Sequence, residues 1–366
     1  MTRRLVLLAD ASNVHTVKWA REFAARAWDV HVLSLLPAEI PGVEVHHLRP
    51  SMAGKVGYLS VVGAVRALVR RLRPDLLHAH YATSYGLLGA LASHRPFVIS
   101  VWGSDVYAFP AKSPVHRALL SWNLRQADAV TSSSHAMAEV TAPLVPARAI
   151  QVIPFGVPLD RFGPAAPGEM LTIGCAKSLE TIYGQEYLIR AVRLVLDRRP
   201  DLQFRLLLAG DGARRTALVS LIAELRLEEV VHLLGRLPHS EVPAFLASLS
   251  IFAMPSLSES FGVAAVEAAA CGLPVVASRV GGVGEVVLDR ETGLLVPPAD
   301  PDALAQALER LLLDPALRSR MGEQGRAHVA RSFDWQRNAD AMEDLYGRLL
   351  TRPPSNRAVS PQEAAS

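Results

Sequence analysis

Two carboxylates, Glu259 and Glu267, lie in the segment 254–267, which reads MPSLSESFGVAAVE. The apolar residues at its start predict the end of a buried strand, the polar residues predict a loop, and the Ala-rich run predicts a helix starting near Phe261 or Gly262. A carboxylate on so apolar a helix must find hydrogen-bond donors or stay in water. Ribose hydroxyls suit Glu267 and sugar hydroxyls suit Glu259, while the N–H groups at the helix start suit a diphosphate.

The same residues also have a purely structural interpretation, in which Glu267 forms an ordinary salt bridge and Glu259 is a solvated loop residue. A cation, Lys177, follows another predicted strand at 171–175. It faces the same ligand if that strand ends at the ligand-binding edge, and is a surface lysine otherwise. Two carboxylates and one lysine therefore suggest a site without defining it.

Two other patterns imitate metal sites. His78-Ala79-His80 places two imidazoles on one face of a predicted strand, but no carboxylate or cysteine accompanies them there. Asp300-Pro301-Asp302 precedes an apolar helical pattern and is typical of an N-cap followed by proline at the first helical position. The sequence therefore predicts no metal and no bound cofactor.

Short apolar runs alternate with helical patterns and predict the elements that position these residues. The predicted strands cover 5–9, 30–34, 43–48, 76–80, 97–101, 129–132, 171–175, 204–209, 230–234, 251–254 and 274–278. Such alternation predicts α/β domains with parallel, doubly wound sheets. A Pro/Gly-rich stretch at 154–168 separates two such domains, whose strand ends would share one ligand-binding cleft.

The segment 254–267 resembles the donor site of glycosyltransferase family 4, whose hallmark is two glutamates separated by seven residues with Phe-Gly after the first. The similarity continues to about residue 301, includes 206–212 and 234–235 upstream, and covers nearly the whole chain. The resemblance implies a GT-B fold, with two Rossmann-like domains and a cleft between them. Its implied parts are an acceptor-binding domain at 1–165, a nucleotide-sugar-binding domain at 166–334, a helix at 335–350 that crosses back to the first domain, and a disordered tail at 351–366.

The resemblance assigns roles by position. The implied donor-binding residues are Lys177, Gly210, Glu259, Phe261, Gly262, Val263 and Glu267. Glu259 would hold the donor sugar, Glu267 the ribose, and Lys177 the diphosphate. Family members usually place a second cation where this chain has Tyr183, so another donor, such as Arg279 or a group of the other domain, is expected to replace it.

In the first half, Val101-Trp102-Gly103-Ser104-Asp105 resembles a loop that reads His-Gly-x-Asp in many family members. The resemblance implies Asp105 as a catalytic residue beside Glu259 and Lys177, and places His15, Trp102 and Asp105 among the acceptor or cleft candidates. Alternatives remain for each: Asp105 caps the following turn, Trp102 belongs to the core, and His15 is an ordinary residue at a helix start.

The implied activity is retaining, metal-independent transfer from a nucleotide diphosphate sugar, with uridine expected as the base, to a saccharide, lipid-linked or small-molecule acceptor. One alternative is a GT-B-fold nucleotide-sugar epimerase or phosphorylase. Another is an inactive nucleotide-sugar-binding subunit, suggested by the unusual Trp102 and Tyr183.

The charge composition limits which kinds of binding partner are expected. The net charge of +3 on 366 residues gives no reason to expect nucleic acid, but residues 1–165 carry +7 and residues 166–366 carry −4. An arginine-rich helical pattern at 62–73 suggests either core packing with solvated arginines or a membrane-facing patch. Only two cysteines, no long apolar run and no signal-peptide pattern predict a cytoplasmic protein, with peripheral contact at the inner face of the cell membrane as the second interpretation.

Overall fold

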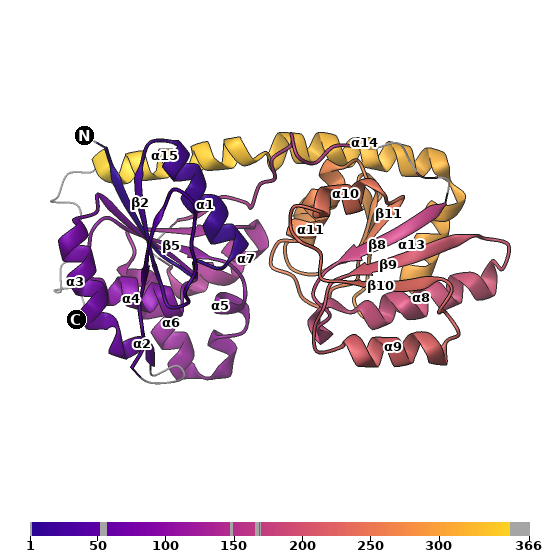
Figure 1. Cartoon of the computed structure of the whole chain (residues 1–366), viewed down its shortest axis with the longest axis horizontal. Helices are drawn as coiled ribbons and strands as arrows, with labels where there is room; N and C mark the ends of the chain where they lie inside the picture. Colours follow the sequence, from indigo (N-terminus) through magenta and orange to yellow (C-terminus); the bar gives the residue numbers. More distant parts are fainter. Residues whose placement is uncertain (1, 52–56, 147–148, 165–167, 169, 352–366) are drawn as a thin grey trace. The chain divides into compact units, whose positions relative to one another are not determined.

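The computed structural model describes residues 2–51, 57–146, 149–164, 168 and 170–351, which form two compact units (Figure 1). The first unit comprises the residues up to Ile153 together with those from Ala339 onward, and the second comprises Pro154–Asn338. The second unit thus begins upstream of the expected boundary at 165/166. Its first residues are held by backbone hydrogen bonds, because Val157 N donates to Phe333 O and Trp335 N donates to Val157 O. The predicted tail at 352–366 lies outside the described residues.

The first unit is built on a seven-stranded parallel sheet in the order β3-β2-β1-β4-β5-β6-β7. Its strands are β1 (Arg4–Leu8), β2 (Asp29–Ser34), β3 (Glu44–His47), β4 (Leu76–His80), β5 (Phe97–Val101), β6 (Ala129–Ser132) and β7 (Ile150–Val152). Its helices are α1 (Val14–Ala25), α2 (Gly57–Ser60), α3 (Val62–Leu72), α4 (Ser84–Ala92), α5 (Ser104–Tyr107), α6 (Pro114–Gln126), α7 (His135–Thr141) and the 3₁₀ turns η1 (Pro110–Lys112) and η2 (Ala142–Leu144).

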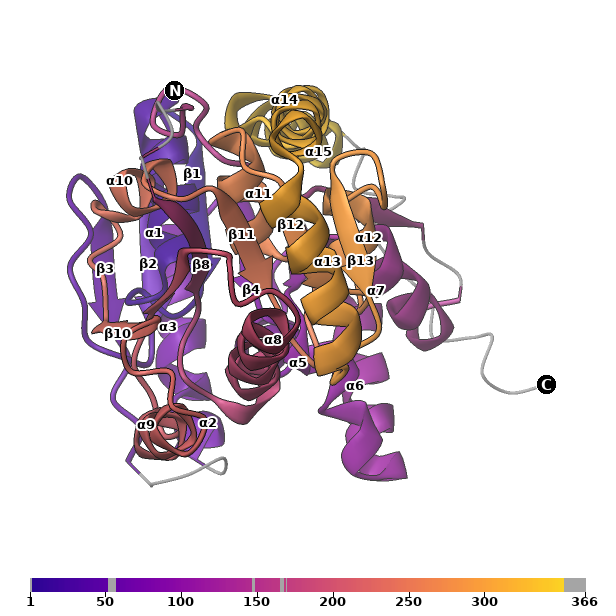
Figure 2. The same cartoon turned by 90° about the vertical axis from the view of Figure 1, so that its right-hand side faces the viewer.

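The second unit has a six-stranded parallel sheet in the order β10-β9-β8-β11-β12-β13. Its strands are β8 (Leu171–Ala176), β9 (Phe204–Ala209), β10 (Val231–Gly235), β11 (Ile251–Met254), β12 (Val275–Ser278) and β13 (Gly293–Val296). Its helices are η3 (Thr181–Tyr183), α8 (Gln185–Arg198), α9 (Arg215–Glu224), α10 (Val242–Ala247), α11 (Val263–Ala270), α12 (Val283–Val286), α13 (Pro301–Leu313) and α14 (Pro315–Ser332). Helices α8 and α13 lie side by side (Figure 2).

Both sheets follow one rule of strand order. In each unit the first strand lies between the second and the fourth, so the order reverses between β1 and β4 and again between β8 and β11. Ligands of doubly wound proteins bind beyond the carboxyl ends of the strands at this switch point. The fold class predicted from the sequence is confirmed. The short strands β7 and β13 were not predicted, since one has three half-buried residues and the other begins with glycine.

The last helix, α15 (Trp335–Thr351), begins among residues of the second unit, and from Ala339 onward it belongs to the first. In the first unit Tyr346 is almost fully buried and its hydroxyl lies 2.6 Å from His78 Nδ1. Arg26 adds ion pairs of 2.6 Å to Asp340 and 2.8 Å to Glu343. A buried polar contact and charged pairs thus fix this segment to the first unit.

No helix among the described residues is both long and apolar enough to cross a membrane.

Candidate functional site

Lys177 and Glu259 lie together at the switch point of the second unit. Lys177 follows β8 and Glu259 follows β11, the two strands between which the order reverses. Their side chains form an ion pair, with Lys177 Nζ 2.6 Å from Glu259 Oε2. Both side chains are largely buried, at 15% and 13% exposure, so this ion pair is mostly shielded from solvent.

Glycines that follow the two neighbouring strands pack directly against the backbone of the loops that carry this pair. Gly210 follows β9 with φ +152°, and a Cβ there would lie 1.9 Å from Lys177 O. Gly281 follows β12 with φ +48°, and a Cβ there would lie 1.8 Å from Glu259 O. No side chain fits at either position, so the backbone at Lys177 and at Glu259 is fixed by close approach of a glycine. This is how adjacent strand ends hold the pair.

Helix α11 follows the Glu259 loop, as predicted, with Gly262 at its N-cap in a left-handed conformation, φ +99°. Phe261 is 1% exposed, and its ring centroid lies 5.3 Å from that of Phe333. The side chain of Phe261 therefore belongs to the core. Val263 and Glu267 are four residues apart and half-buried among fully buried neighbours, so one face of α11 remains accessible with a carboxylate on it.

Tyr183 stands where family members usually have a second cation, and its ring contacts the ammonium of Lys177. Lys177 Nζ lies 4.9 Å from the centroid of the Tyr183 ring, within the range of a cation–π interaction. Tyr183 therefore positions the lysine instead of adding positive charge. Arg279, the expected substitute, is paired with Asp289 at 2.7 Å.

A hollow of about 500 Å³ in the second unit brings another cation to this region. Its lining consists of Ser178, Tyr183, Gly212 and Arg236 together with two carboxylates, Glu180 and Asp211. Arg236 follows β10, and the carbonyl oxygen of its neighbour Gly235 accepts a hydrogen bond of 2.7 Å from Gly210 N. Sequence reasoning missed Arg236, although a cation directly after a strand-terminal glycine was the available signal.

In the first unit Asp105 is completely buried and accepts backbone hydrogen bonds. Its Oδ2 accepts from Ala82 N at 2.8 Å, and its Oδ1 accepts from Gly103 N at 2.8 Å and Trp102 N at 3.2 Å. Burial raises the pKa of Asp105, and these N–H donors act against that rise. The carboxylate ties the loop after β4 to the loop after β5. This geometry supports a positioning residue, not the group in contact with substrate that the sequence suggested.

His15 and Trp102 meet at the switch point of the first unit. Their ring centroids lie 6.0 Å apart in a T-shaped arrangement, and Trp102 also lies 4.6 Å from His80. His15 is the second residue of α1, which follows β1, and His80 ends β4, so the three rings come from both sides of the switch point. Burial lowers the pKa of His80 well below its usual value. The structure thus brings His15 and Trp102 together, and their role toward an acceptor stays a prediction.

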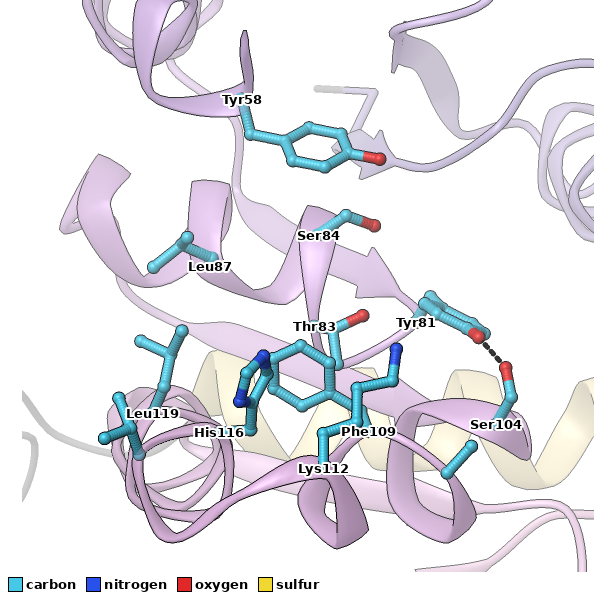
Figure 3. Close-up of a pocket in the computed structure, with 12 residues that line it drawn as sticks. Tyr58, Tyr81, Thr83, Ser84, Leu87, Ser104, Phe109, Lys112, His116 and Leu119 are labelled. Atoms are coloured by element: carbon cyan, nitrogen blue, oxygen red, sulfur yellow. Dashed lines mark hydrogen bonds between the residues drawn. The ribbon is translucent and has the colours of Figure 1, made fainter. Parts of the chain in front are cut away.

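Beside this cluster the first unit has a hollow of about 470 Å³ (Figure 3). Tyr81, Thr83, Phe109, Lys112 and His116 are among its lining residues. Figure 3 shows the Lys112 ammonium directed toward the space between Thr83 and Tyr81, whose hydroxyl bonds with that of a neighbouring serine. The hollow therefore combines hydroxyls, aromatic rings and a cation, a set suited to a polar molecule with negative charge.

The two patterns that imitate metal sites have other functions. Asp300 Oδ1 accepts a hydrogen bond of 2.9 Å from Ala303 N, which confirms it as the N-cap of α13. His78 is fully buried and uses both ring nitrogens, with Nε2 2.7 Å from Ser100 Oγ and Nδ1 on Tyr346. Its contacts are those of a core residue.

Comparisons with known proteins agree with this geometry. Residues 157–328 match the family described as glycosyl transferases group 1, and residues 4–134 match a family described as glycosyl transferase 4-like. A D-inositol 3-phosphate glycosyltransferase of Nocardiopsis dassonvillei is 30% identical over 94% of this chain and 91% of its own length. Another of that name from Corynebacterium jeikeium is 37% identical over 59% of this chain and 55% of its own length.

Solved structures resemble the chain in fold. Sucrose-phosphate synthase from Thermosynechococcus elongatus superposes with a TM-score of 0.83 at 24% identity, covering 95% of this chain and 99% of that one. HepE of Anabaena, solved with UDP-glucose, gives 0.79 at 22% identity over 94% and 100%. Two doubly wound units of this kind define the GT-B class. The chain belongs to the family 4 type of GT-B glycosyltransferases.

Proposed function

We propose that this glycosyltransferase moves a sugar from a uridine diphosphate sugar to an acceptor with retention of the anomeric configuration. The observation that carries the proposal is the Lys177–Glu259 pair at the switch point, directly before the start of α11. HepE of Anabaena, a neighbour in fold, was solved with UDP-glucose, which supports uridine as the base.

The donor would be held by both charge and shape. Glu259 accepts hydrogen bonds from hydroxyls of the sugar, and Glu267 accepts them from the ribose. Backbone N–H groups at Gly262 and Val263 and the ammonium of Lys177 face the diphosphate, with Arg236 as the second cation. These positive groups stabilise the leaving diphosphate, and no metal ion takes part in the reaction.

The reaction requires no protein base. The bond from the anomeric carbon to the diphosphate oxygen breaks, and the acceptor hydroxyl forms its bond to that carbon on the same face. The departing diphosphate takes the acceptor proton, which keeps the configuration and balances the step. Asp105 contributes by holding the backbone of the loop that follows β5, and not by proton transfer.

The acceptor we propose is a small phosphorylated polyol bound in the hollow of the first unit. Its hydroxyls would form hydrogen bonds with the hydroxyls of Tyr81 and Thr83, and its phosphate would bind Lys112 and His116. The name D-inositol 3-phosphate glycosyltransferase, borne by the relatives, describes an acceptor of this chemistry. A lipid-linked acceptor is the second candidate, because Val115 and Leu119 line the same hollow with exposures of 74% and 38%.

The test is a transfer assay with UDP-glucose and UDP-N-acetylglucosamine against inositol phosphates, free inositol and a lipid-linked saccharide. We expect transfer to a phosphorylated polyol, and a product whose anomeric proton coupling shows retention. An inverted product would contradict the mechanism. Sugar release without any acceptor would indicate an epimerase, dependence on inorganic phosphate would indicate a phosphorylase, and saturable UDP binding without turnover would indicate a binding subunit.

A further inference from the structure

The edge of the first sheet carries three metal-ligating side chains on two neighbouring strands. His31 lies on β2, and Glu44 and His46 lie on β3, the edge strand. The parallel register places His31 opposite Glu44 and Leu33 opposite His46. Because side chains alternate along a strand, these three project from the same face of the sheet.

Their ligand atoms have the spacing of a tetrahedral metal site. His31 Nδ1 lies 3.1 Å from His46 Nε2 and 3.4 Å from Glu44 Oε2. His46 Nε2 lies 3.5 Å from Glu44 Oε1. A tetrahedral zinc ion with bonds of about 2.0–2.1 Å holds its ligand atoms about 3.3–3.4 Å apart. An ion could therefore be bound with small side-chain adjustments.

A second carboxylate, Asp29, lies beside the buried imidazole of His31. His31 is 5% exposed, and its other nitrogen, Nε2, lies 3.3 Å from Asp29 Oδ1 without forming a hydrogen bond. Asp29 is itself fixed, because its Oδ2 accepts a hydrogen bond of 2.6 Å from Arg4 Nε. A histidine that ligates a metal usually donates its other N–H to a carboxylate, which directs the ligand nitrogen at the ion.

We propose that His31, Glu44 and His46 form a zinc-binding site that ties the edge strand β3 to β2, with Asp29 orienting His31. Two imidazoles and one carboxylate favour zinc over magnesium or calcium, which prefer oxygen ligands throughout. The protein supplies three ligands, so water completes the coordination. The site lies on the edge strand β3 and its neighbour β2, whereas ligands of this fold bind at the switch point between β1 and β4, so its role is structural.

Zinc titration into the untagged, chelator-treated full chain tests the proposal by calorimetry. We expect one equivalent to bind and zinc to raise the melting temperature, since a ligand of the folded state stabilises it. His46→Ala and Glu44→Gln should weaken binding by at least about tenfold, and Asp29→Asn by roughly tenfold to a hundredfold. Cobalt in place of zinc should give the intense visible absorption of a four-coordinate ion.

The exposed His47, next to His46 on the same strand, provides the matched control. His47→Ala should bind zinc like the natural chain. The melting temperature of each zinc-free variant, compared with that of the zinc-free natural chain, checks that the variant is folded. Absence of zinc binding by the natural chain, normal binding by folded His46→Ala, or equal loss in His47→Ala would each overturn the proposal.

Discussion

At the scale of single residues, the Lys177–Glu259 pair sets the electrostatics of the donor site. Each charge neutralises the other at 2.6 Å, so neither is left uncompensated in a largely buried place. Under the proposed function, a bound donor offers hydroxyls to Glu259 and phosphate oxygens to Lys177, and so replaces one charged contact by two. The Tyr183 ring, 4.9 Å from the ammonium, keeps the lysine in place during that exchange.

Because the two glutamates are proposed to hold different parts of the donor, their variants should differ. Glu267→Ala should weaken binding of free UDP, since losing a charged acceptor for hydroxyls costs about 1.5–3 kcal/mol, roughly a tenfold to over a hundredfold loss of affinity. Glu259→Ala should not weaken UDP binding, because it leaves Lys177 free for the diphosphate, and it should lose most transfer, because the proposed ligand of Glu259 is the sugar. Calorimetry with UDP and a transfer assay measure both effects.

The control for this pair is Glu291→Ala, an exposed glutamate of the same unit. It should change neither UDP binding nor transfer. The reverse pattern, with UDP affinity lost in Glu259→Ala and kept in Glu267→Ala, would show that the donor lies differently along α11.

Prediction from sequence succeeded where the signal was local. The strand before Glu259, the helix start at Gly262 and the N-cap at Asp300 were all readable from neighbouring residues. It failed where the partners are distant in sequence. The hydrogen bond from Ala82 N to Asp105 and the register that joins His31 to Glu44 depend on chain segments that come together only in the folded sheet.

At the scale of elements, α3 shows which part of the basic pattern faces water. Val65, Val69 and Leu72 are buried in the first unit's core, and Arg70 and Arg71 are exposed. The apolar stripe of this helix is therefore not available to enter a bilayer. Any membrane contact through α3 would depend on its charges alone.

Binding to anionic vesicles should accordingly be electrostatic. Each arginine near a negative surface contributes about 1 kcal/mol, so changing Arg70 and Arg71 to Glu should lower vesicle affinity by at least roughly thirtyfold. Co-sedimentation should also weaken as salt rises. The control is the double change of Arg215 and Arg226 to Glu, both exposed in the second unit. Equal binding to neutral vesicles, or no binding, would exclude this membrane contact.

The buried His78, on β4, should make the first unit sensitive to acid. Burial lowers the pKa of His78 to about 3, whereas the unfolded residue titrates near 6.5. The unfolded chain therefore takes up a proton that the folded chain does not, and stability falls as pH drops from about 6.5 toward 3. At pH 5 His78 alone should lower the free energy of unfolding by about 2 kcal/mol.

Tryptophan fluorescence during denaturant unfolding at pH 7 and pH 5 measures this loss, because Trp19, Trp28, Trp102 and Trp122 lie in the first unit. His78→Gln keeps polar atoms but does not titrate in this range, so its stability should fall less between the two pH values. A loss as large in that variant as in the natural chain would rule out His78 as its source.

At the scale of the whole molecule, the two units place different chemistry at equivalent positions. The switch point of the second unit holds a charged pair, whereas that of the first holds His15, Trp102 and the buried His80. Under the proposed function, the second unit binds the anionic donor and the first unit binds the hydroxyl-bearing acceptor. The proposed zinc ligands lie elsewhere, on the edge strand β3 and its neighbour β2.

Chelation should therefore separate catalysis from stability. We expect transfer to continue at full rate in EDTA, because Lys177, Arg236 and the amides at the start of α11 supply the positive charge that the leaving diphosphate needs. If zinc joins β2 to β3, EDTA should lower the melting temperature of the natural chain and leave that of Glu44→Gln unchanged. The assay is run well below both melting temperatures so that unfolding does not imitate loss of chemistry. Loss of transfer in EDTA that manganese or magnesium restores would show that a metal takes part in catalysis, and the lysine-based account of the donor site would then be wrong.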